Sequence, residues 1–430
     1  MTIEALYQIY RQHPSVQTDS RKLQSGDLFF ALKGERYNGN QFAQQAIENG
    51  AVLVVVDEPV QTSSPDKVVR FDNTLLALQD LARYHRQQFS IPFLAITGSN
   101  GKTTSKELIH AVLSSTFRTY TTAGNLNNHI GIPLTLLAIR PDAQMAVIEM
   151  GANHLHEIEG YCRYVQPTHG IITNCGKAHL EGFGSLEGVR KGKGELYDYL
   201  RAQGGTVFVM WDYDYLRQMS SGIAELVTYG TSHAGLTGVI ETNDPFLEVR
   251  ITGGSSLQQI HSRLVGGYNL ANILAAVCVG QYFNVADQKI QAALEGYTPS
   301  NSRSQLIRRG SNQIILDAYN ANPSSMRAAI ENLANTKADN KVLILGAMAE
   351  LGSDSIAEHR QIINLIAGYP WRQVILVGGD FEKLDPPPPY LVFSDAVQVR
   401  DWLIAHPLEN SYALVKGSRS MQMEKLLAEG

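Results

Sequence analysis

Residues 91–104 of the chain read IPFLAITGSNGKTT. The mostly apolar run at 93–97 predicts a buried strand, the glycines at 98 and 101 predict a tight turn, and a helical pattern begins at Lys102. Glycines let the backbone bend so that successive N–H groups point at phosphate oxygens, and a helix N-terminus adds partial positive charge. The segment therefore predicts a nucleoside triphosphate site of the P-loop type.

The loop is shorter than the usual pattern G-x-x-x-x-G-K-[ST], because Ile96 stands where that pattern has its first glycine. A glycine turn without a ligand is the alternative, but the strand, glycines, Lys-Thr-Thr and helix together favour the P-loop. In that interpretation the lysine reaches the outer phosphates and the following threonine ligates Mg²⁺. The predicted triphosphate-binding residues are Gly98, Ser99, Asn100, Gly101, Lys102, Thr103 and Thr104.

Short apolar runs alternate with amphipathic stretches along the rest of the chain. Most of these runs are rich in Val and Ile on both faces, which is typical of strands buried in a parallel sheet. Alternating strands and helices predict doubly wound α/β layers. We expect strands at 27–32, 52–56, 93–97, 145–150, 170–173, 313–317, 342–345, 373–377 and 412–415. We expect helices at 102–116, 186–201, 269–283, 324–335 and 396–406.

The expected fold is α/β with three domains, each a mainly parallel or mixed sheet with flanking helices. Residues 225–264 have no helical period and predict a small antiparallel β insertion in the central P-loop domain. The last domain is expected to be Rossmann-like. Polar breaker clusters near 87–92 and 297–304 suggest the linkers. The resulting domains are 1–88, 89–298 and 299–430.

Composition limits the functional classes. The 430 residues carry a net charge of −5, which argues against a protein that binds nucleic acid non-specifically. No apolar run approaches the roughly 18 residues that span a bilayer, and the N-terminus lacks the features of a secretory signal. Three scattered cysteines, Cys162, Cys175 and Cys278, suit a reducing compartment. We therefore expect a cytoplasmic protein without a membrane or nucleic-acid partner.

Polar residues follow several expected strands of the central block. Glu149 ends one strand and faces the crevice where ligands of α/β sheets bind, as a Mg²⁺ ligand or as a structural carboxylate. His179 follows the next strand, as a metal or proton-transfer group or as a hydrogen-bonded loop residue. Lys193 lies in a basic helical stretch that is either a solvated face or aimed at phosphates. The amide-rich loop at 122–128 binds a polar substrate or satisfies its own backbone.

Two polar segments follow strands of the last block. Asp317 stands at the end of one strand, where it is placed to meet a ligand. Asn322 and Pro323 are suited to cap and begin the helix that follows it. The segment 416–419, Lys-Gly-Ser-Arg, follows the final strand and is placed in the same way.

Taken together, these motifs resemble the Mur ligase family, the ATP-dependent amide-bond ligases of peptidoglycan precursor synthesis. Residues 97–104 are similar to the family's ATP loop and 124–133 to its substrate loop. The segments 149–152, 178–180 and 192–197 are similar to those that hold Mg²⁺ and a carbamylated lysine in the family. The segments are the following: TGSNGKTT, GNLNNHIGIP, EMGA, AHL and GKGELY.

The resemblance points to one branch, which adds D-alanyl-D-alanine. Residues 317–323 (DAYNANP), 345–352 (LGAMAELG) with His359, and 416–420 (KGSRS) are similar to that branch. The Asp-Asn-Pro-Arg motif of the neighbouring branch, which adds a diamino acid, is absent from the sequence.

The resemblance implies roles for individual residues. Lys102, Lys193, His179 and Arg303 would be catalytic, and Lys193 would carry CO₂ as N6-carboxylysine. Asn272 would contact adenine, Arg303 the terminal phosphate and Asp317 the ribose of ATP. The implied Mg²⁺ ligands, for two ions, are Thr103, Glu149, His179 and the Lys193 carbamate. The implied substrate-binding residues are Ser20, Arg21, Lys33, Asn125, Asn127, Asn128, Tyr319, Asn320 and Asn322.

The resemblance also implies the reaction. ATP phosphorylates the terminal carboxylate of UDP-N-acetylmuramoyl-tripeptide, the amine of D-alanyl-D-alanine attacks the acyl phosphate, and ADP and phosphate leave. The first domain would bind the UDP-sugar, the second ATP, and the third would complete the ligase site of a monomeric enzyme. The alternatives are another Mur or folylpolyglutamate ligase, and a P-loop switch protein that joins no substrates.

Overall fold

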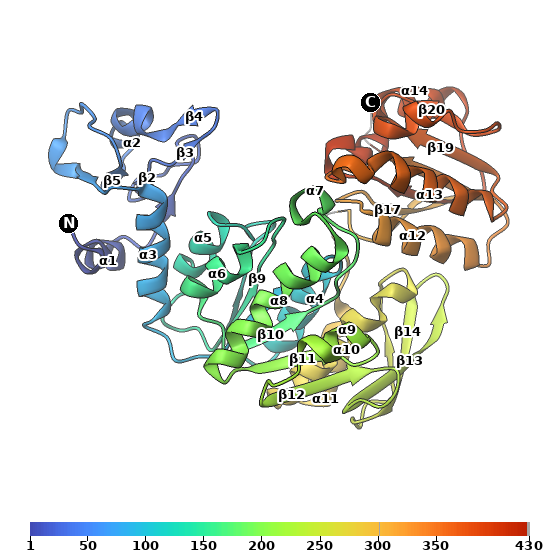
Figure 1. Cartoon of the computed structure of the whole chain (residues 1–430), viewed down its shortest axis with the longest axis horizontal. Helices are drawn as coiled ribbons and strands as arrows, with labels where there is room; N and C mark the ends of the chain where they lie inside the picture. Colours follow the sequence, from blue (N-terminus) through green and yellow to red (C-terminus); the bar gives the residue numbers. More distant parts are fainter. Residues whose placement is uncertain (301, 428–430) are drawn as a thin grey trace.

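Strands with buried side chains build three large sheets in the computed structural model, which describes residues 1–300 and 302–427 (Figure 1). Residues 33–34 and 37–38 pair in a fourth sheet of two strands. Burial on both faces explains the Val- and Ile-rich runs in the sequence, because helices cover both sides of such sheets. The three sheets follow one another along the chain, so each is made by a continuous stretch of sequence.

The N-terminal sheet has four parallel strands in the order β1-β2-β5-β6. Helix α3 packs against α1 on one side and against α5 and α6 of the central unit on the other, so it joins the two units. In Figure 1, α3 is the helix between the blue N-terminal sheet and the green centre. The elements are α1 (Ile3–Gln12), β1 (Val16–Gln17), β2 (Leu28–Phe30), β3 (Lys33–Gly34), β4 (Tyr37–Asn38), α2 (Ala43–Glu48), β5 (Leu53–Val56), β6 (Val68–Arg70) and α3 (Thr74–Arg86).

The central sheet has nine strands in the order β15-β14-β13-β12-β11-β10-β7-β9-β8. Helix α10, which is buried on nearly all sides, packs against α4 and the middle of the sheet. The elements are β7 (Phe93–Thr97), α4 (Lys102–Ser114), β8 (Thr119–Thr121), α5 (Gly131–Leu137), β9 (Met145–Glu149), α6 (Glu157–Val165), β10 (His169–Ile172), α7 (Leu180–Phe183), α8 (Leu186–Gln203), β11 (Thr206–Met210), α9 (Asp214–Met219), β12 (Glu225–Gly230), β13 (Leu236–Asn243), β14 (Leu247–Gly253), β15 (Gln259–His261), α10 (Leu270–Tyr282) and α11 (Asp287–Gly296).

The C-terminal sheet has six strands in the order β16-β17-β21-β18-β19-β20, all parallel except β16. Asn322 caps α12 and Pro323 is its first residue, as the sequence predicts. The elements are β16 (Gln305–Arg309), β17 (Asn312–Asp317), α12 (Pro323–Asn335), β18 (Lys341–Gly346), α13 (Ser355–Ala367), β19 (Gln373–Val377), β20 (Leu391–Phe393), α14 (Ala396–Ala405) and β21 (Tyr412–Lys416).

All the expected strands form, and the expected antiparallel region is confirmed in β13, β14 and β15. These strands extend the central sheet, however, because β12 pairs in parallel with β11 and connects them to it. The strand β11 was not predicted, although its five residues TVFVM are all buried. The strands β1, β3, β4, β6, β8 and β20 were not predicted either, because they have only two or three residues each and carry little periodicity. The five-residue strand β16 was also not predicted, since none of its side chains is fully buried.

The strand order brings three loops to one edge of the central sheet. Strands β10, β7 and β9 are parallel neighbours, so the segments after Thr97, Glu149 and Ile172 leave the sheet at the same edge. Ligands of open α/β sheets bind at the carboxyl ends of the strands. In the C-terminal sheet, the carboxyl ends of the parallel strands β17 and β21 also meet at one edge. The register pairs Asp317 with Lys416 there.

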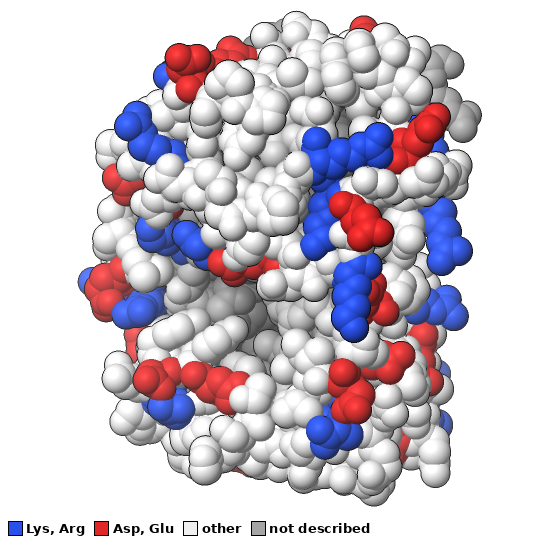
Figure 2. Space-filling model, turned by 90° about the vertical axis from the view of Figure 1, so that its right-hand side faces the viewer, with Lys and Arg blue, Asp and Glu red and all other residues white. Residues whose placement is uncertain are grey.

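Charged side chains of both signs are interspersed around a hollow on the face shown in Figure 2. This mixture agrees with the small net charge of −5. None of the helices within the described residues is long and apolar enough to cross a membrane.

Candidate active site between the central and C-terminal domains

Two glycines fix the phosphate loop between β7 and α4. Gly98 has a φ of 141° and Gly101 a φ of 80°. A Cβ atom would lie 2.0 Å from Thr173 Oγ1 at the first position and 2.6 Å from Asn272 Oδ1 at the second. Neither position accepts a side chain without rearrangement, because both the backbone conformation and the neighbouring atoms exclude it.

The phosphate loop is hydrogen-bonded to the segment that follows β10. The Ser99 N–H donates to the Asn174 carbonyl oxygen (2.9 Å), and the Asn100 N–H donates to Asn174 Oδ1 (3.0 Å). Asn174 Nδ2 returns a bond to the Asn100 carbonyl oxygen (3.0 Å). Two amides expected to face phosphate are therefore engaged within the protein. The N–H groups of the first turn of α4, which begins at Lys102, have no acceptor inside the helix and remain available for an anion.

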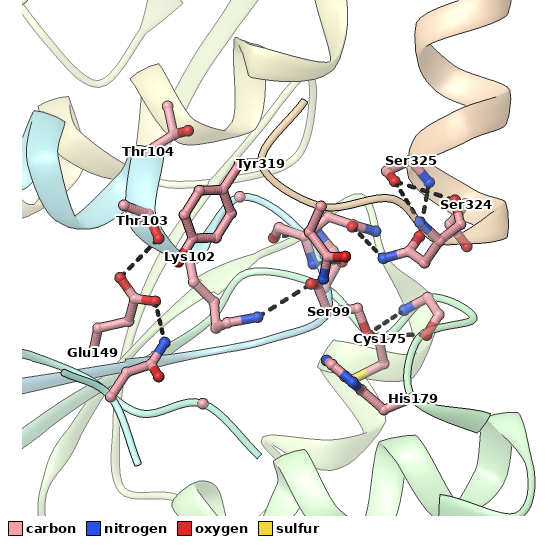
Figure 3. Close-up of a pocket in the computed structure, with 18 of the residues that line it drawn as sticks. Ser99, Lys102, Thr103, Thr104, Glu149, Cys175, His179, Tyr319, Ser324 and Ser325 are labelled. Atoms are coloured by element: carbon pink, nitrogen blue, oxygen red, sulfur yellow. Dashed lines mark hydrogen bonds between the residues drawn. The ribbon is translucent and has the colours of Figure 1, made fainter. Parts of the chain in front are cut away.

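Lys102 folds back over the loop that precedes it. Its Nζ donates to the carbonyl oxygen of Gly98 at 2.6 Å. It also donates to the carbonyl oxygen of Ser99 at 3.1 Å (Figure 3). Loss of hydration lowers the pKa of Lys102, and the positive charge of Arg303 lowers it further. An anion beside Lys102 would replace two neutral acceptors with a charged one, so the geometry favours phosphate binding here.

Glu149 is buried at the end of β9 with only 1% of its surface exposed. Its Oε2 accepts a hydrogen bond from Thr103 Oγ1 (2.9 Å), and its Oε1 accepts one from Asn127 Nδ2 (2.8 Å). Lys106 Nζ lies 3.8 Å from Oε2 and donates to the Thr122 carbonyl oxygen at 2.8 Å. The sequence analysis missed Lys106; its position one helical turn after Lys102 was the available signal.

His179 and Lys193 approach the same region from different elements. His179 Nδ1 lies 2.6 Å from Glu350 Oε2, a contact between the central and C-terminal domains that lowers the pKa of Glu350. Lys193 is fully buried in α8 and donates from Nζ to the Ala152 carbonyl oxygen (2.7 Å). Burial, together with the charge of Lys102, lowers the pKa of Lys193 to about 7.

The C-terminal domain supplies the opposite wall. Lys416 Nζ lies 2.6 Å from Asp317 Oδ2, so the two residues paired by the sheet register also form an ion pair. The Arg303 guanidinium lies over the Tyr319 ring, 3.7 Å from its centroid. Asn322 Nδ2 donates to Asn100 Oδ1 (2.7 Å), which ties the C-terminal domain directly to the phosphate loop.

Most of these groups line one cavity of about 800 Å³ between the two domains, but Gly98, Lys106 and Glu350 do not. Lys193 is buried behind this wall, and Asn125 lines an adjoining cavity. Tyr213 and Tyr215 also line the cavity, and the sequence did not predict them. The predicted site residues that line the cavity are Ser99, Asn100, Gly101, Lys102, Thr103, Thr104, Asn127, Asn128, Glu149, His179, Asn272, Arg303, Asp317, Tyr319, Asn320 and Asn322.

The predicted substrate residues of the N-terminal unit line neither of these two cavities. Lys33 Nζ forms ion pairs with Asp57 (3.0 Å) and Glu58 (2.6 Å). Arg21 pairs with Asp19 at 2.8 Å and is largely exposed.

The donor set around Glu149 suits a hard cation. Carboxylate and hydroxyl oxygens are the ligands that Mg²⁺ prefers, usually with phosphate oxygens and waters completing its shell. No cluster of three His, Cys, Asp or Glu side chains that would hold a metal by itself occurs within 1–300 and 302–427. Glu149 and Thr103 therefore fit an ion that arrives with a phosphate ligand.

The fold and the site together define a P-loop nucleotide-binding protein of the α/β class, with its site closed by a second α/β domain. Comparison with known sequences is more specific. Residues 14–86 match the Mur ligase family catalytic domain, 96–280 the Mur ligase middle domain, and 302–419 the Mur ligase glutamate ligase domain. The chain belongs to the Mur ligase family.

Individual relatives and solved structures are similar to this chain along nearly its whole length. The chain is 36% identical to the UDP-N-acetylmuramoyl-tripeptide–D-alanyl-D-alanine ligase of Escherichia coli (strain K12), over 96% of this chain and 92% of that protein. A crystal structure of MurF from Acinetobacter baumannii has a TM-score of 0.87 and 31% identity, and covers 96% of this chain and 92% of that one. MurF ligase from Thermotoga maritima in complex with ADP has a TM-score of 0.86 at 24% identity, covering 96% of both chains.

Lys102→Met tests the phosphate loop. Removing the positive charge that lies over this loop should lower turnover by at least about 100-fold, because it would no longer balance the charge of a bound phosphate. The free energy of unfolding should stay unchanged or rise, because a poorly hydrated charge is replaced by an apolar chain of similar length. Steady-state kinetics and urea denaturation measure the two effects, with Lys337→Met as the exposed control. Unchanged turnover in Lys102→Met would contradict the assignment.

Proposed function

We propose that this protein joins D-alanyl-D-alanine to UDP-N-acetylmuramoyl-tripeptide in peptidoglycan precursor synthesis. The protein is an ATP-dependent ligase that forms a carbon–nitrogen bond. The observation that carries the specific assignment is similarity to ligases of that name over 96% of the chain, with a phosphate loop and a C-terminal domain facing one cavity. A nucleotide switch without ligase activity would not need the second wall of this cavity.

The chemistry requires two anions to meet, because the triphosphate and the substrate carboxylate repel each other. Lys102 and Arg303 both line the cavity, and we assign them to neutralise the transferred phosphoryl group. Asn272 and Asp317, at opposite walls, are assigned to adenine and ribose. Positioning of this kind supplies most of the acceleration in phosphoryl transfer, since little covalent help from the protein is needed.

Magnesium ions, two in this proposal, would supply positive charge to the phosphate oxygens and polarise the transferred group. Thr103, Glu149 and His179 are the side chains assigned to hold them. Thr103 and Glu149 are already joined by a hydrogen bond, so their oxygens lie together. His179 would exchange its Glu350 contact for this role.

Lys193 is proposed to carry a carbamate. An amine must be uncharged to react with CO₂, and burial lowers the pKa of Lys193 to about 7, so a large neutral fraction exists near neutral pH. The carbamate would place a negative charge in a buried position close to Lys102, whose positive charge already lowers the pKa of Lys193. The two groups would then stabilise each other, where two ammonium groups repel.

The proposal divides the molecule into domains 1–88, 89–298 and 299–430, for the UDP-sugar, ATP and the final ligase steps. In the first domain, Ser20, Arg21 and Lys33 are assigned to the UDP-sugar. Arg21 and Lys33 are paired with carboxylates in the described structure, so substrate phosphates would have to replace Asp19 and the pair Asp57 and Glu58. In the C-terminal domain, Tyr319, Asn320 and Asn322 are assigned to the substrates, with Asn125, Asn127 and Asn128 facing them. We place the enzyme in the cytoplasm, as a monomer.

A substrate panel tests the function. Purified protein with ATP and Mg²⁺ should release phosphate only when UDP-N-acetylmuramoyl-tripeptide and D-alanyl-D-alanine are both present. Mass spectrometry should show a product equal to the two substrates joined with loss of water. Equal use of L-lysine, diaminopimelate or glutamate in place of the dipeptide would assign the chain to another ligase branch. Phosphate release without any joined product would indicate a nucleotide switch.

NMR with ¹³C-labelled bicarbonate tests the carbamate. The protein should give a carbamate carbon signal that strengthens as the pH rises through about 7, because the neutral amine of Lys193 becomes more abundant. Lys193→Met should lose this signal, and Lys289→Met, at a surface lysine, should keep it. A spectrum in which Lys193→Met retains the signal would exclude Lys193 as its source.

A further inference from the structure

A second cavity of about 680 Å³ adjoins the first and extends into the C-terminal domain. Thr103, His179, Arg303, Tyr319 and Asn320 line both cavities, so the two share the region where phosphoryl transfer would occur. The part that belongs to the second cavity alone is lined on the C-terminal side by the segment 418–420, Ser-Arg-Ser, and by Ser302, Ala349, Glu350 and Glu424. A molecule in this cavity can therefore have one end at the transferred phosphoryl group and the other at segment 418–420.

Arg419 is the basic side chain that lines this cavity but not the first. Its Nη1 donates to Glu424 Oε1 at 2.8 Å, and no other hydrogen bond of its guanidinium occurs within 1–300 and 302–427. The side chain is 65% exposed, so most of its donors face open space. The guanidinium carbon also lies over the Tyr319 ring, 5.9 Å from the centroid.

The neighbouring serines give this end of the cavity a fixed shape. Ser418 is buried, and its Oγ donates to the Ala347 carbonyl oxygen at 2.6 Å. Ser420 Oγ lies 3.1 Å from Ser418 Oγ, so a hydrogen bond joins the hydroxyl groups of the two residues that flank Arg419. A guanidinium with free parallel donors beside hydroxyl groups matches the planar geometry of a carboxylate.

Arg303 and Arg419 are suited to different anions. Arg303 lines both cavities, and its positive charge lowers the pKa of Lys102. Arg303 therefore lies close to the phosphate loop. Arg419 lines only the second cavity, and its guanidinium lies farther from the Tyr319 ring than that of Arg303, at 5.9 Å against 3.7 Å from the centroid. Arg303 is placed to bind the triphosphate, and Arg419 is placed to bind an anion at the far end of the second cavity.

We infer that the second cavity receives the acceptor dipeptide and that Arg419 binds its terminal carboxylate. The inference rests on the proposed function, in which the acceptor is a short peptide with a free amine and a free carboxylate. An extended dipeptide spans about 7 Å, enough to separate its attacking amine from a charged group bound elsewhere. Binding the carboxylate at Arg419 directs the amine toward Thr103 and the shared region, and selects acceptors that end in a free carboxylate.

The test compares D-alanyl-D-alanine with its C-terminal amide, which lacks the negative charge. The unmodified protein should prefer the free dipeptide in kcat/KM. In Arg419→Gln the KM for the free dipeptide should rise about 10- to 100-fold, the loss expected for a charged hydrogen-bonded contact. The ratio of kcat/KM between the two acceptors should fall at least tenfold. Arg419→Lys, which keeps the charge but not the paired donors, should lie between the two.

Controls separate this effect from general damage. The KM values for ATP and UDP-N-acetylmuramoyl-tripeptide should stay within twofold in Arg419→Gln. Arg400→Ala, an arginine of α14 that pairs with Asp401 and lines neither cavity, should behave as the unmodified protein. Thermal denaturation checks that each variant is folded; if Arg419→Gln is not, the acceptor ratio in Arg419→Lys decides.

In Arg419→Gln, a less than tenfold fall in the ratio of kcat/KM between the free dipeptide and its amide would overturn the inference. An equal rise in the KM for ATP or for UDP-N-acetylmuramoyl-tripeptide would also overturn it. Joining of the dipeptide by the unmodified protein would then leave the proposed function standing. Absence of any dipeptide product from the unmodified protein would overturn both.

Discussion

The hydrogen bonds between Asn174 and the phosphate loop are the contact on which the rest of the site depends. They hold the backbone at Ser99 and Asn100 and leave the first turn of α4 as the free anion-binding surface. Gly98 contacts this same segment so closely that a methyl group would overlap Thr173. The parallel pairing of β10 with β7 brings the two loops together, so the architecture of the sheet determines where phosphate binds. Asn322 then connects the loop to the C-terminal domain.

The site concentrates positive charge in a place with little water. Lys102 and Lys106 lie at the first turns of α4 beside the phosphate loop, and Glu149 is a buried carboxylate next to Lys106. Burial makes the charged forms of such lysines costly, which is why the pKa values of Lys102 and Lys193 are lowered. A bound triphosphate would supply the negative charge that this arrangement lacks. The site is therefore suited to an anionic substrate. The electrostatic cost of burying the charged lysines is relieved only when such a substrate binds.

Local sequence patterns were sufficient for most of the buried strands and for the N-terminal cap of α12. The run at 93–97 and the cap at Asn322 depend on neighbouring residues, so a single sequence reveals them. Contacts between distant segments were not predictable in the same way. Asn174 bonds to Asn100 across 74 positions, and no local rule connects them. The strand β12 was assigned to an antiparallel region because its partner β11 was not recognised, and only pairing fixes the direction of a strand. The resemblance to a known family, and not periodicity, selected Lys193.

In the proposed reaction, the triphosphate held by this loop activates a carboxylate for attack by an amine. Transfer of an oxygen atom from the carboxylate to phosphate would demonstrate this activation. UDP-N-acetylmuramoyl-tripeptide with ¹⁸O at both oxygens of its terminal carboxylate is converted with ATP and D-alanyl-D-alanine, and the released phosphate is analysed by mass spectrometry. Each phosphate released with product should carry one oxygen from the carboxylate, because that oxygen bridges the acyl phosphate. Unlabelled phosphate alongside full product formation would contradict this reaction.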